Sequence, residues 1–488
     1  MTIQTTIQSP SPLTGGTDPG NPITNAAALS PWLAGNFAPI AMECDAPHLP
    51  VTGDLPRELR GTLFRNGPNP QFTPLDPMSN HWFSGDGMLH GFTLQDGRAS
   101  YRNRWIRTAK WEAERAAGRS LISDYSVAPG LDADFADEGV ANTNVISHAG
   151  RLLALEEGHP PIEIDPATLA TRGPRFFGGR LDGPFTAHPK IDPLTGELVF
   201  FGFAAAGPLS AEISFGTIGA DGHVKRFERF QAPYCSMVHD FIVTQRHVLF
   251  PILPLSGSKA RLRDGGSPFA WEPELGGHVG LMLREQGVAS LRWFRIENCY
   301  VFHVLNAWDD GGRIVADVMQ YDQPPLFPNA DGSPPAGDAQ ARLVRWTLDP
   351  AARTDAFSRV MLDDMPGEFP RIDDRRAGLR NRFGAFSARG RRSGGLDSIV
   401  WLDLAAGRRA VFTLPLGDGV SEPVFVPRHE EAPEGEGWLL TVAFRGEERR
   451  SDLLVFETGG IDRGPIATVH LSHRVPFGFH GNWVNGTV

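Results

Sequence analysis

Residues 301–305, Val-Phe-His-Val-Leu, place a histidine in the middle of an apolar run that is typical of a buried β-strand. A buried, neutral imidazole needs a hydrogen bond or a metal ion at its ring nitrogens. Three further histidines lie in or beside similar stretches: His188 in Phe-Thr-Ala-His-Pro-Lys, His239 in Met-Val-His-Asp and His480 in Gly-Phe-His-Gly-Asn-Trp. Four such rings meeting at one point would form an all-nitrogen site suited to a divalent transition ion.

The spacing of these residues along the chain predicts an architecture. The second histidine follows the first by 51 positions, and the third, His303, follows after 64 more. Glu368 in Gly-Glu-Phe-Pro-Arg and Glu422 in Ser-Glu-Pro-Val continue the series at intervals of 65 and 54, and the fourth histidine follows after 58. A step of this size is typical of four-stranded propeller blades that each offer one residue to a central axis. Roughly 450 ordered residues at that step predict about seven blades.

Short strand-like runs separated by turn signals recur along the chain. The clearest runs are Arg151–Leu155, Glu197–Phe203, His247–Leu253, Arg313–Met319, Ala341–Leu348, Ser398–Leu404, Trp438–Phe444 and Asp452–Glu457. Only Thr108–Gly118 has helix chemistry, with an early Glu, several alanines and a terminal Gly. We therefore expect an all-β fold, with a single seven-bladed β-propeller over residues 36–488. A disordered tail over residues 1–35, rich in Ser, Thr, Pro, Gly and Asn, is expected to precede it.

Composition limits the class of protein. Hydrophobic residues at 41% and charged residues at 21% are typical of a globular chain with a full-sized core. The formal charge of −11 argues against nucleic acid as a partner, but it leaves peripheral membrane contact open. Three cysteines without a Cys-x-x-Cys pair indicate a reducing compartment and no disulfide framework. With no leader-like segment and no apolar run of about 18 residues, we expect a cytoplasmic location.

Other catalytic patterns are weaker. The sequence contains no Gly-x-Ser-x-Gly, His-Glu-x-x-His, phosphate-loop or dinucleotide fingerprint, so neither NAD nor flavin is expected. Cys235 and His239 form a possible nucleophile and base pair, but a buried free thiol is the favoured interpretation. On the residues alone, a structural role for the four histidines stays as open as a metal role.

Several ordered motifs carry a resemblance to a known family. They are Gly61-Thr-Leu-Phe-Arg-Asn-Gly-Pro68, His81-Trp-Phe-Ser-Gly-Asp-Gly-Met88, Arg102-Asn-Arg-Trp-Ile-Arg-Thr108 and Ala141-Asn-Thr-Asn144, followed by the histidine and glutamate motifs. In these motifs the chain resembles the carotenoid cleavage oxygenase superfamily, including its bacterial apocarotenoid and lignostilbene-type oxygenases. The resemblance runs from about residue 35 to the C-terminus.

The resemblance implies a seven-bladed propeller with a dome of loops and short helices over an active site on its axis. It implies that Fe(II) is bound by His188, His239, His303 and His480. It also implies that Glu157 (chosen over Glu156), Glu368 and Glu422 accept hydrogen bonds from three of these rings, and that Thr143 lies near an open coordination position. Carboxylates behind neutral imidazoles would offset the charge of the ion and fix which ring nitrogen faces it.

The resemblance further implies a non-haem Fe(II) dioxygenase, with dioxygen as co-substrate, that cleaves a conjugated carbon–carbon double bond into two carbonyl products. A flat, apolar substrate would need an aromatic-lined entry. Phe83, Trp105 and Phe302 are the candidate lining residues, and ordinary core packing is the alternative for each. The oligomeric state is not predicted.

Two substrate classes compete. Stilbene-cleaving members of the family hold a phenol oxygen with a Tyr and a Lys, whereas this chain has Trp105 at the first position and Glu138 near the second. The departure favours an apocarotenoid, with a stilbene-cleaving dioxygenase as the alternative. A polyene isomerase or a metal-dependent hydrolase on a propeller is more remote. For an apolar patch at a membrane, the candidates are Pro31-Trp-Leu33 and the insertion Leu253–Trp271.

Overall fold

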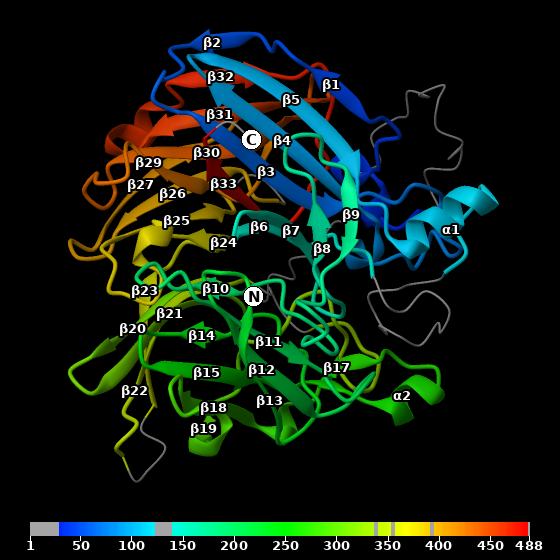
Figure 1. The fold of residues 1–488 in the computed structure, drawn as a ribbon, viewed down its shortest axis with the longest axis vertical. Helices are drawn as coiled ribbons and strands as arrows, with labels where there is room; N and C mark the ends of the chain where they lie inside the picture. Colours follow the sequence, from blue (N-terminus) through cyan, green and yellow to red (C-terminus); the bar gives the residue numbers. More distant parts are fainter. Residues whose placement is uncertain (1–28, 123–138, 336–339, 353–356, 391–394, 487–488) are drawn as a thin grey trace, which may run out of the picture.

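The computed structural model describes residues 29–122, 139–335, 340–352, 357–390 and 395–486. Seven antiparallel sheets are arranged in a ring as the blades of a propeller (Figure 1). Within most blades each strand pairs with the next one along the chain, since short turns join them. The predicted fold class is therefore confirmed.

Four blades consist of four strands that follow one another in the sequence. These strands are β6 (Asn144–His148), β7 (Arg151–Leu155), β8 (Ile162–Ile164) and β9 (Thr171–Pro174); β10 (Lys190–Ile191), β11 (Leu198–Phe203), β12 (Glu212–Ile218) and β13 (Val224–Gln231); β20 (Tyr300–Asp310), β21 (Arg313–Tyr321), β22 (Arg342–Leu348) and β23 (Phe357–Asp363); β24 (Gly367–Arg371), β25 (Phe383–Ala388), β26 (Ser398–Asp403) and β27 (Arg408–Thr413). A fifth blade contains β14 (Ile242–Val243), β15 (His247–Ile252), β18 (Gly277–Leu283) and β19 (Arg292–Ile296), with the hairpin β16 (Leu255–Gly257) and β17 (Phe269–Trp271) inserted.

The remaining two blades combine strands from both ends of the chain. One contains β1 (Cys44–Ala46), β5 (Arg98–Trp105), β4 (Gly87–Gln95), β3 (Gly61–Pro68) and β33 (Gly481–Asn485). The other contains β2 (Val51–Gly53), β32 (Ala467–His470), β31 (Arg450–Glu457), β30 (Gly437–Arg445), β28 (Gly419–Val420) and β29 (Val424–Pro427). Leu63 lies opposite Trp483, and Thr52 lies opposite Thr468. The ring is thus closed twice by backbone pairing, which leaves no open seam between the first and last blades.

The core lies between the blades rather than on one face of each sheet. All residues of β11, β15 and β26 are buried, because each of these strands has another blade on both sides. The rings of Phe201 in β11 and Phe241 at the start of the next blade are 4.8 Å apart. This packing holds neighbouring blades at a fixed distance and so fixes the position of their inner ends.

The eight predicted strand runs are all strands, with ends within about two residues. The predicted helix is α1 (Ala109–Ala117), which Thr108 caps and left-handed Gly118 ends. The other helical segments are α2 (Lys259–Arg263) and the 3-10 helices η2 (Pro31–Leu33), η3 (Gly35–Phe37), η4 (Trp82–Ser84), η5 (Pro273–Leu275), η6 (Gly287–Ser290), η7 (Asp374–Arg376) and η8 (Thr458–Arg463). Within the described ranges, none of the helices has the length and hydrophobicity needed to span a membrane.

Two expectations need correction. The predicted tail extends too far, because residues 30–37 are ordered: Ser30 caps η2, Leu33 is buried, and the Trp32 ring stacks on Trp82 at 5.5 Å. Of the two stretches named as candidates for an apolar patch, Leu253–Trp271 offers no apolar surface, whereas in the first stretch Pro31 is exposed and Trp32 is half-buried. In the second stretch Phe269 and Trp271 are buried, and the exposed residues there are polar, charged or small.

Candidate metal centre

The seven blades each bring one candidate residue to the inner end of the ring. Each of these residues lies at or beside the innermost strand of its blade. They are Thr143 before β6, His188 before β10, His239 before β14, His303 in β20, Glu368 in β24, Glu422 between β28 and β29, and His480 before β33. The near-constant spacing along the chain therefore corresponds to the length of one blade.

The four predicted histidines converge. One ring nitrogen from each lies within 4.8 Å of those of the other three, and all four rings are buried. Neighbouring Nε2 atoms are 3.0 Å apart between His188 and His239, 3.1 Å between His239 and His303, and 3.1 Å between His303 and His480. The geometric part of the sequence prediction is confirmed.

Carboxylates fix the orientation of three rings. Glu157 pairs with Nδ1 of His239, Oε2 of Glu368 lies 2.5 Å from Nδ1 of His303, and Oε1 of Glu422 lies 2.9 Å from Nδ1 of His480. The neighbouring Glu156 instead pairs with His159. Each carboxylate accepts a hydrogen bond from the Nδ1–H group of its ring, so the Nε2 atom of that ring carries a lone pair.

The two short Nε2–Nε2 contacts of His303, with His239 and with His480, are therefore not hydrogen bonds, because these nitrogens are acceptors that face one another. Such an arrangement is repulsive unless a cation lies between them. Adjacent ligands at right angles around an ion with metal–nitrogen bonds of about 2.1 Å would be about 3.0 Å apart. The measured separations match that value. The donor set thus fits a divalent transition ion, which His188, His239, His303 and His480 would hold.

The pKa shifts of His188 and His480 agree with neutral ligands, whereas that of His303 has the opposite direction. Burial lowers the pKa of His188 well below its usual range and that of His480 to about 4, so both rings are neutral near pH 7. Burial acts in the same direction on His303, but the nearby charge of Glu368 outweighs it and raises that pKa. For Glu422, burial acts to raise the pKa, and Arg371 and His480 outweigh it and bring it to about 2. The carboxylate behind His480 is therefore ionised.

Two arginines accompany Glu422. Arg371 Nη1 lies 3.1 Å from Glu422 Oε2, which also accepts a 2.9 Å hydrogen bond from the backbone N–H of Gly481. Arg65 Nη1 donates to Ser421 Oγ at 2.5 Å, next to Glu422 in the chain. Burial lowers the pKa of Arg65 to about 10, so the guanidinium remains charged. Both cations favour the ionised form of the carboxylate.

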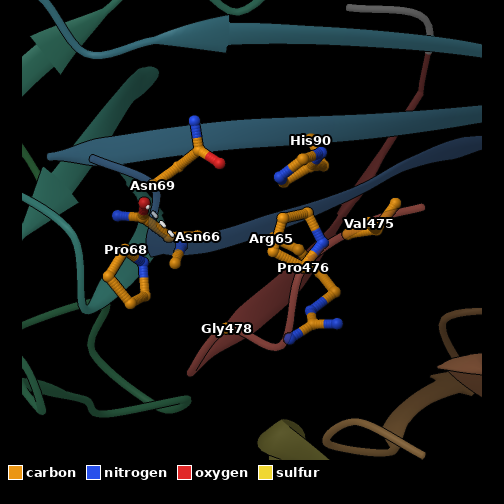
Figure 2. Close-up of a pocket in the computed structure, with 9 residues that line it drawn as sticks. Arg65, Asn66, Pro68, Asn69, His90, Val475, Pro476 and Gly478 are labelled. Carbon is orange, nitrogen blue, oxygen red and sulfur yellow. Dashed lines mark hydrogen bonds between the residues drawn. The ribbon is translucent and has the colours of Figure 1, made fainter. Parts of the chain in front are cut away.

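A small pocket lies beside Arg65, between β3, β4 and the segment that leads to His480 (Figure 2). In this view the guanidinium of Arg65 points away from the His90 ring. Within the described part of the chain, Nε and Nη2 of Arg65 have no hydrogen-bond partner. Arg65 is therefore much less well paired than Arg371. The pocket is lined by Arg65, Asn66, Gly67, Pro68, Asn69, His90, Val475, Pro476 and Gly478.

The candidate lining residues lie in three different settings. Phe302 packs edge-on against His239, with ring centroids 5.2 Å apart, so it supports a ligand ring from behind. Phe83 is half-buried in an aromatic cluster, 5.4 Å from Phe479. Trp105 lies in a separate core cluster with Trp111, and its indole N–H donates to the Asn69 carbonyl. Trp105 is thus better explained by core packing, and Glu138 lies outside the described residues.

Sequence reasoning missed Phe369. Its ring lies 5.5 Å from the His303 ring and 5.3 Å from the His480 ring, and its backbone N–H donates to Glu368 Oε2 at 2.8 Å. Its φ of 58° is in the left-handed region, which is unusual for an aromatic residue. No sequence pattern predicts that conformation; adjacency to Glu368 was the only available signal.

The comparisons with known proteins cover nearly the whole chain. Residues 37–485 match the family described as retinal pigment epithelial membrane protein. An isoeugenol monooxygenase of Pseudomonas nitroreducens is 37% identical over 470 residues, or 93% of this chain and 98% of that protein. The crystal structure of a lignostilbene dioxygenase of Pseudomonas brassicacearum has a TM-score of 0.89 at 33% identity, over 94% of this chain and 99% of that one. A variant of the Synechocystis apocarotenoid oxygenase has a TM-score of 0.83 at 28% identity, over 94% and 99% of the two chains.

Proposed function

This chain belongs to the family of the retinal pigment epithelial membrane protein and the carotenoid cleavage oxygenases, and from that premise we propose that it is an iron(II) dioxygenase that cleaves an aryl-substituted alkene. The substrate class is one in which an aromatic ring is conjugated to the double bond. In the balanced reaction, the alkene and one molecule of dioxygen give two carbonyl products, one of them an aromatic aldehyde.

The convergence of four ring nitrogens, with carboxylates behind three of the rings, carries this proposal. Ferrous iron, when bound by His188, His239, His303 and His480, would supply the site at which dioxygen is activated. The protein contributes the rest. Glu157, Glu368 and Glu422 hold three imidazoles in the tautomer that presents Nε2, and the buried surroundings exclude bulk water from reactive species.

The substrate assignment rests on the relatives. The isoeugenol monooxygenase and the lignostilbene dioxygenase are named for substrates with a phenyl ring beside an alkene, and both are more similar in sequence to this chain than the apocarotenoid oxygenase is. These comparisons favour the stilbene-type alternative over the apocarotenoid expected from the sequence. The Trp105 indole already donates to Asn69, so a substrate phenol gains no hydrogen bond from it.

The test is product analysis by mass spectrometry under ¹⁸O₂, with isoeugenol, resveratrol and an apocarotenal offered separately to iron-loaded protein. We expect an aromatic aldehyde from at least one aryl alkene, with a kcat/KM at least about tenfold above that for the apocarotenal. This ratio corresponds to about 1.4 kcal/mol of transition-state discrimination. Faster cleavage of the apocarotenal would reverse the substrate assignment, and undiminished cleavage without dioxygen would reject the dioxygenase.

A further inference from the structure

Asn142 connects two parts of the proposed site through one side-chain amide. It is buried, and its Nδ2 donates to the carbonyl oxygens of Phe83 and Gly85, both at 2.7 Å. Its Oδ1 accepts a 3.0 Å hydrogen bond from Thr143 Oγ1. Both amide protons are therefore donated to the loop that carries Phe83, and the amide oxygen accepts the hydrogen bond from Thr143.

The backbone of Thr143 is already held in place. Its N–H donates to Leu155 at 2.9 Å, and its carbonyl accepts from the backbone N–H of His480 at 3.1 Å. The remaining freedom of this residue is the rotation of its side chain about χ1. Because Oγ1 and the methyl group share one Cβ, a hydrogen bond that fixes the hydroxyl also fixes the methyl. The side chain is only half-buried, so it borders accessible space at the axis.

We propose that Asn142 is a positioning residue. Its amide fixes the rotation of the Thr143 side chain beside the metal centre and holds that side chain at a constant position relative to the Phe83 loop. The inference rests on the proposed metal centre and deepens it, since it identifies what determines access to an open coordination position. The neighbouring backbone supports a pre-set geometry: Ala141 has a φ of 49°, and its carbonyl accepts a 2.7 Å hydrogen bond from Asn66 Nδ2. In the competing interpretation, Asn142 merely ties down the loop.

The test measures nitric oxide affinity of the anaerobic iron(II)-loaded protein, with iron content and thermal stability recorded for each variant. We expect Asn142→Ala to keep its iron and to change the nitric oxide Kd about fivefold, the equivalent of one neutral hydrogen bond. Thr143→Val, which replaces only the hydroxyl by a methyl group, should produce a similar change. In the Thr143→Val background, Asn142→Ala should then add less than about twofold, because the shared hydrogen bond is already lost.

Asn142→Asp separates the two roles, because it keeps an acceptor for Thr143 and can donate to at most one of the two loop carbonyls, through a protonated carboxyl group. Nitric oxide affinity within about twofold of wild type supports the inference, and an affinity like that of Thr143→Val overturns it. This size-matched variant also carries the test if Asn142→Ala is insoluble. Fully multiplicative effects in the double variant, or no nitric oxide binding to the wild type, would also overturn the inference. No alkene is used, so a failed cleavage assay does not affect the result.

Discussion

Glu422→Gln changes one oxygen of a buried carboxylate into an amide nitrogen and should weaken metal binding. The two Glu422 oxygens face three N–H donors: His480 Nδ1 at 2.9 Å, the Gly481 backbone at 2.9 Å and Arg371 Nη1 at 3.1 Å. A glutamine has one acceptor oxygen, so its NH₂ group must face a donor on one side. If it faces His480, the ring has to move its proton to Nε2, which removes the lone pair that points to the other histidines.

Loss of such an outer hydrogen bond typically lowers metal affinity 10- to 100-fold, or about 1.4–2.8 kcal/mol. We expect a decrease in this range when cobalt(II) is titrated into apoprotein against a competing chelator. Glu114→Gln is the matched control, because Glu114 is an equally buried carboxylate that pairs with Lys110 and Ser120, away from the histidines. A Glu422→Gln affinity within about twofold of wild type, or an equal loss in Glu114→Gln, would refute the reasoning.

Three further outcomes are expected. His239→Ala should lower the iron content far below one per chain in elemental analysis, whereas His223→Ala, at an exposed position, should leave it unchanged. Arg371→Met should lower the free energy of unfolding in urea by about 3 kcal/mol, because it leaves the buried Glu422 carboxylate uncompensated. Arg65→Met should lower it by at most about 1 kcal/mol, because Arg65 is poorly paired. Equal losses in the two variants would contradict this reasoning. Asp86 and Glu114 outweigh burial and raise the pKa of Lys110 above 10.5, so its contribution to stability should be complete below pH 10.5 and be lost as the pH rises through the folded-state pKa. Alkaline unfolding of Lys110→Met should show a smaller decline in stability over that range than the wild type.

Much of the fold was predictable because the signals are local. Alternation of apolar runs and turn residues identified strands such as Arg151–Leu155, and the capping residues of α1 identified the helix. The blade length then appeared as a recurring interval between buried polar residues at the inner ends of the blades. The end of the N-terminal tail was predicted too late in the chain because a tertiary contact decides it. Trp32 is held by stacking on Trp82, a residue fifty positions away.

The details of the site depended on contacts that the sequence does not display. Phe369 adopts a left-handed backbone conformation beside two histidine rings, and an aromatic residue gives no signal for that state. Trp105 was aligned with a substrate-binding position, but its indole is committed to the Asn69 carbonyl. Asn142 lies in the Ala141–Asn144 motif, yet only the three hydrogen bonds of its amide indicate its role.

By itself the sequence determined the strand periodicity, the number of blades and which buried polar residues lie at the inner ends of the blades. All three follow from the local composition of the chain and from the intervals between these residues. Only the tertiary structure decided that Nε2 atoms from four blades come within about 3 Å of their neighbours, and which glutamate supports which ring. The physical reason is ring closure. Pairing of β33 with β3 and of β32 with β2 joins the two ends of the chain, and the packing of all seven blades together sets the distance from each inner strand to the axis.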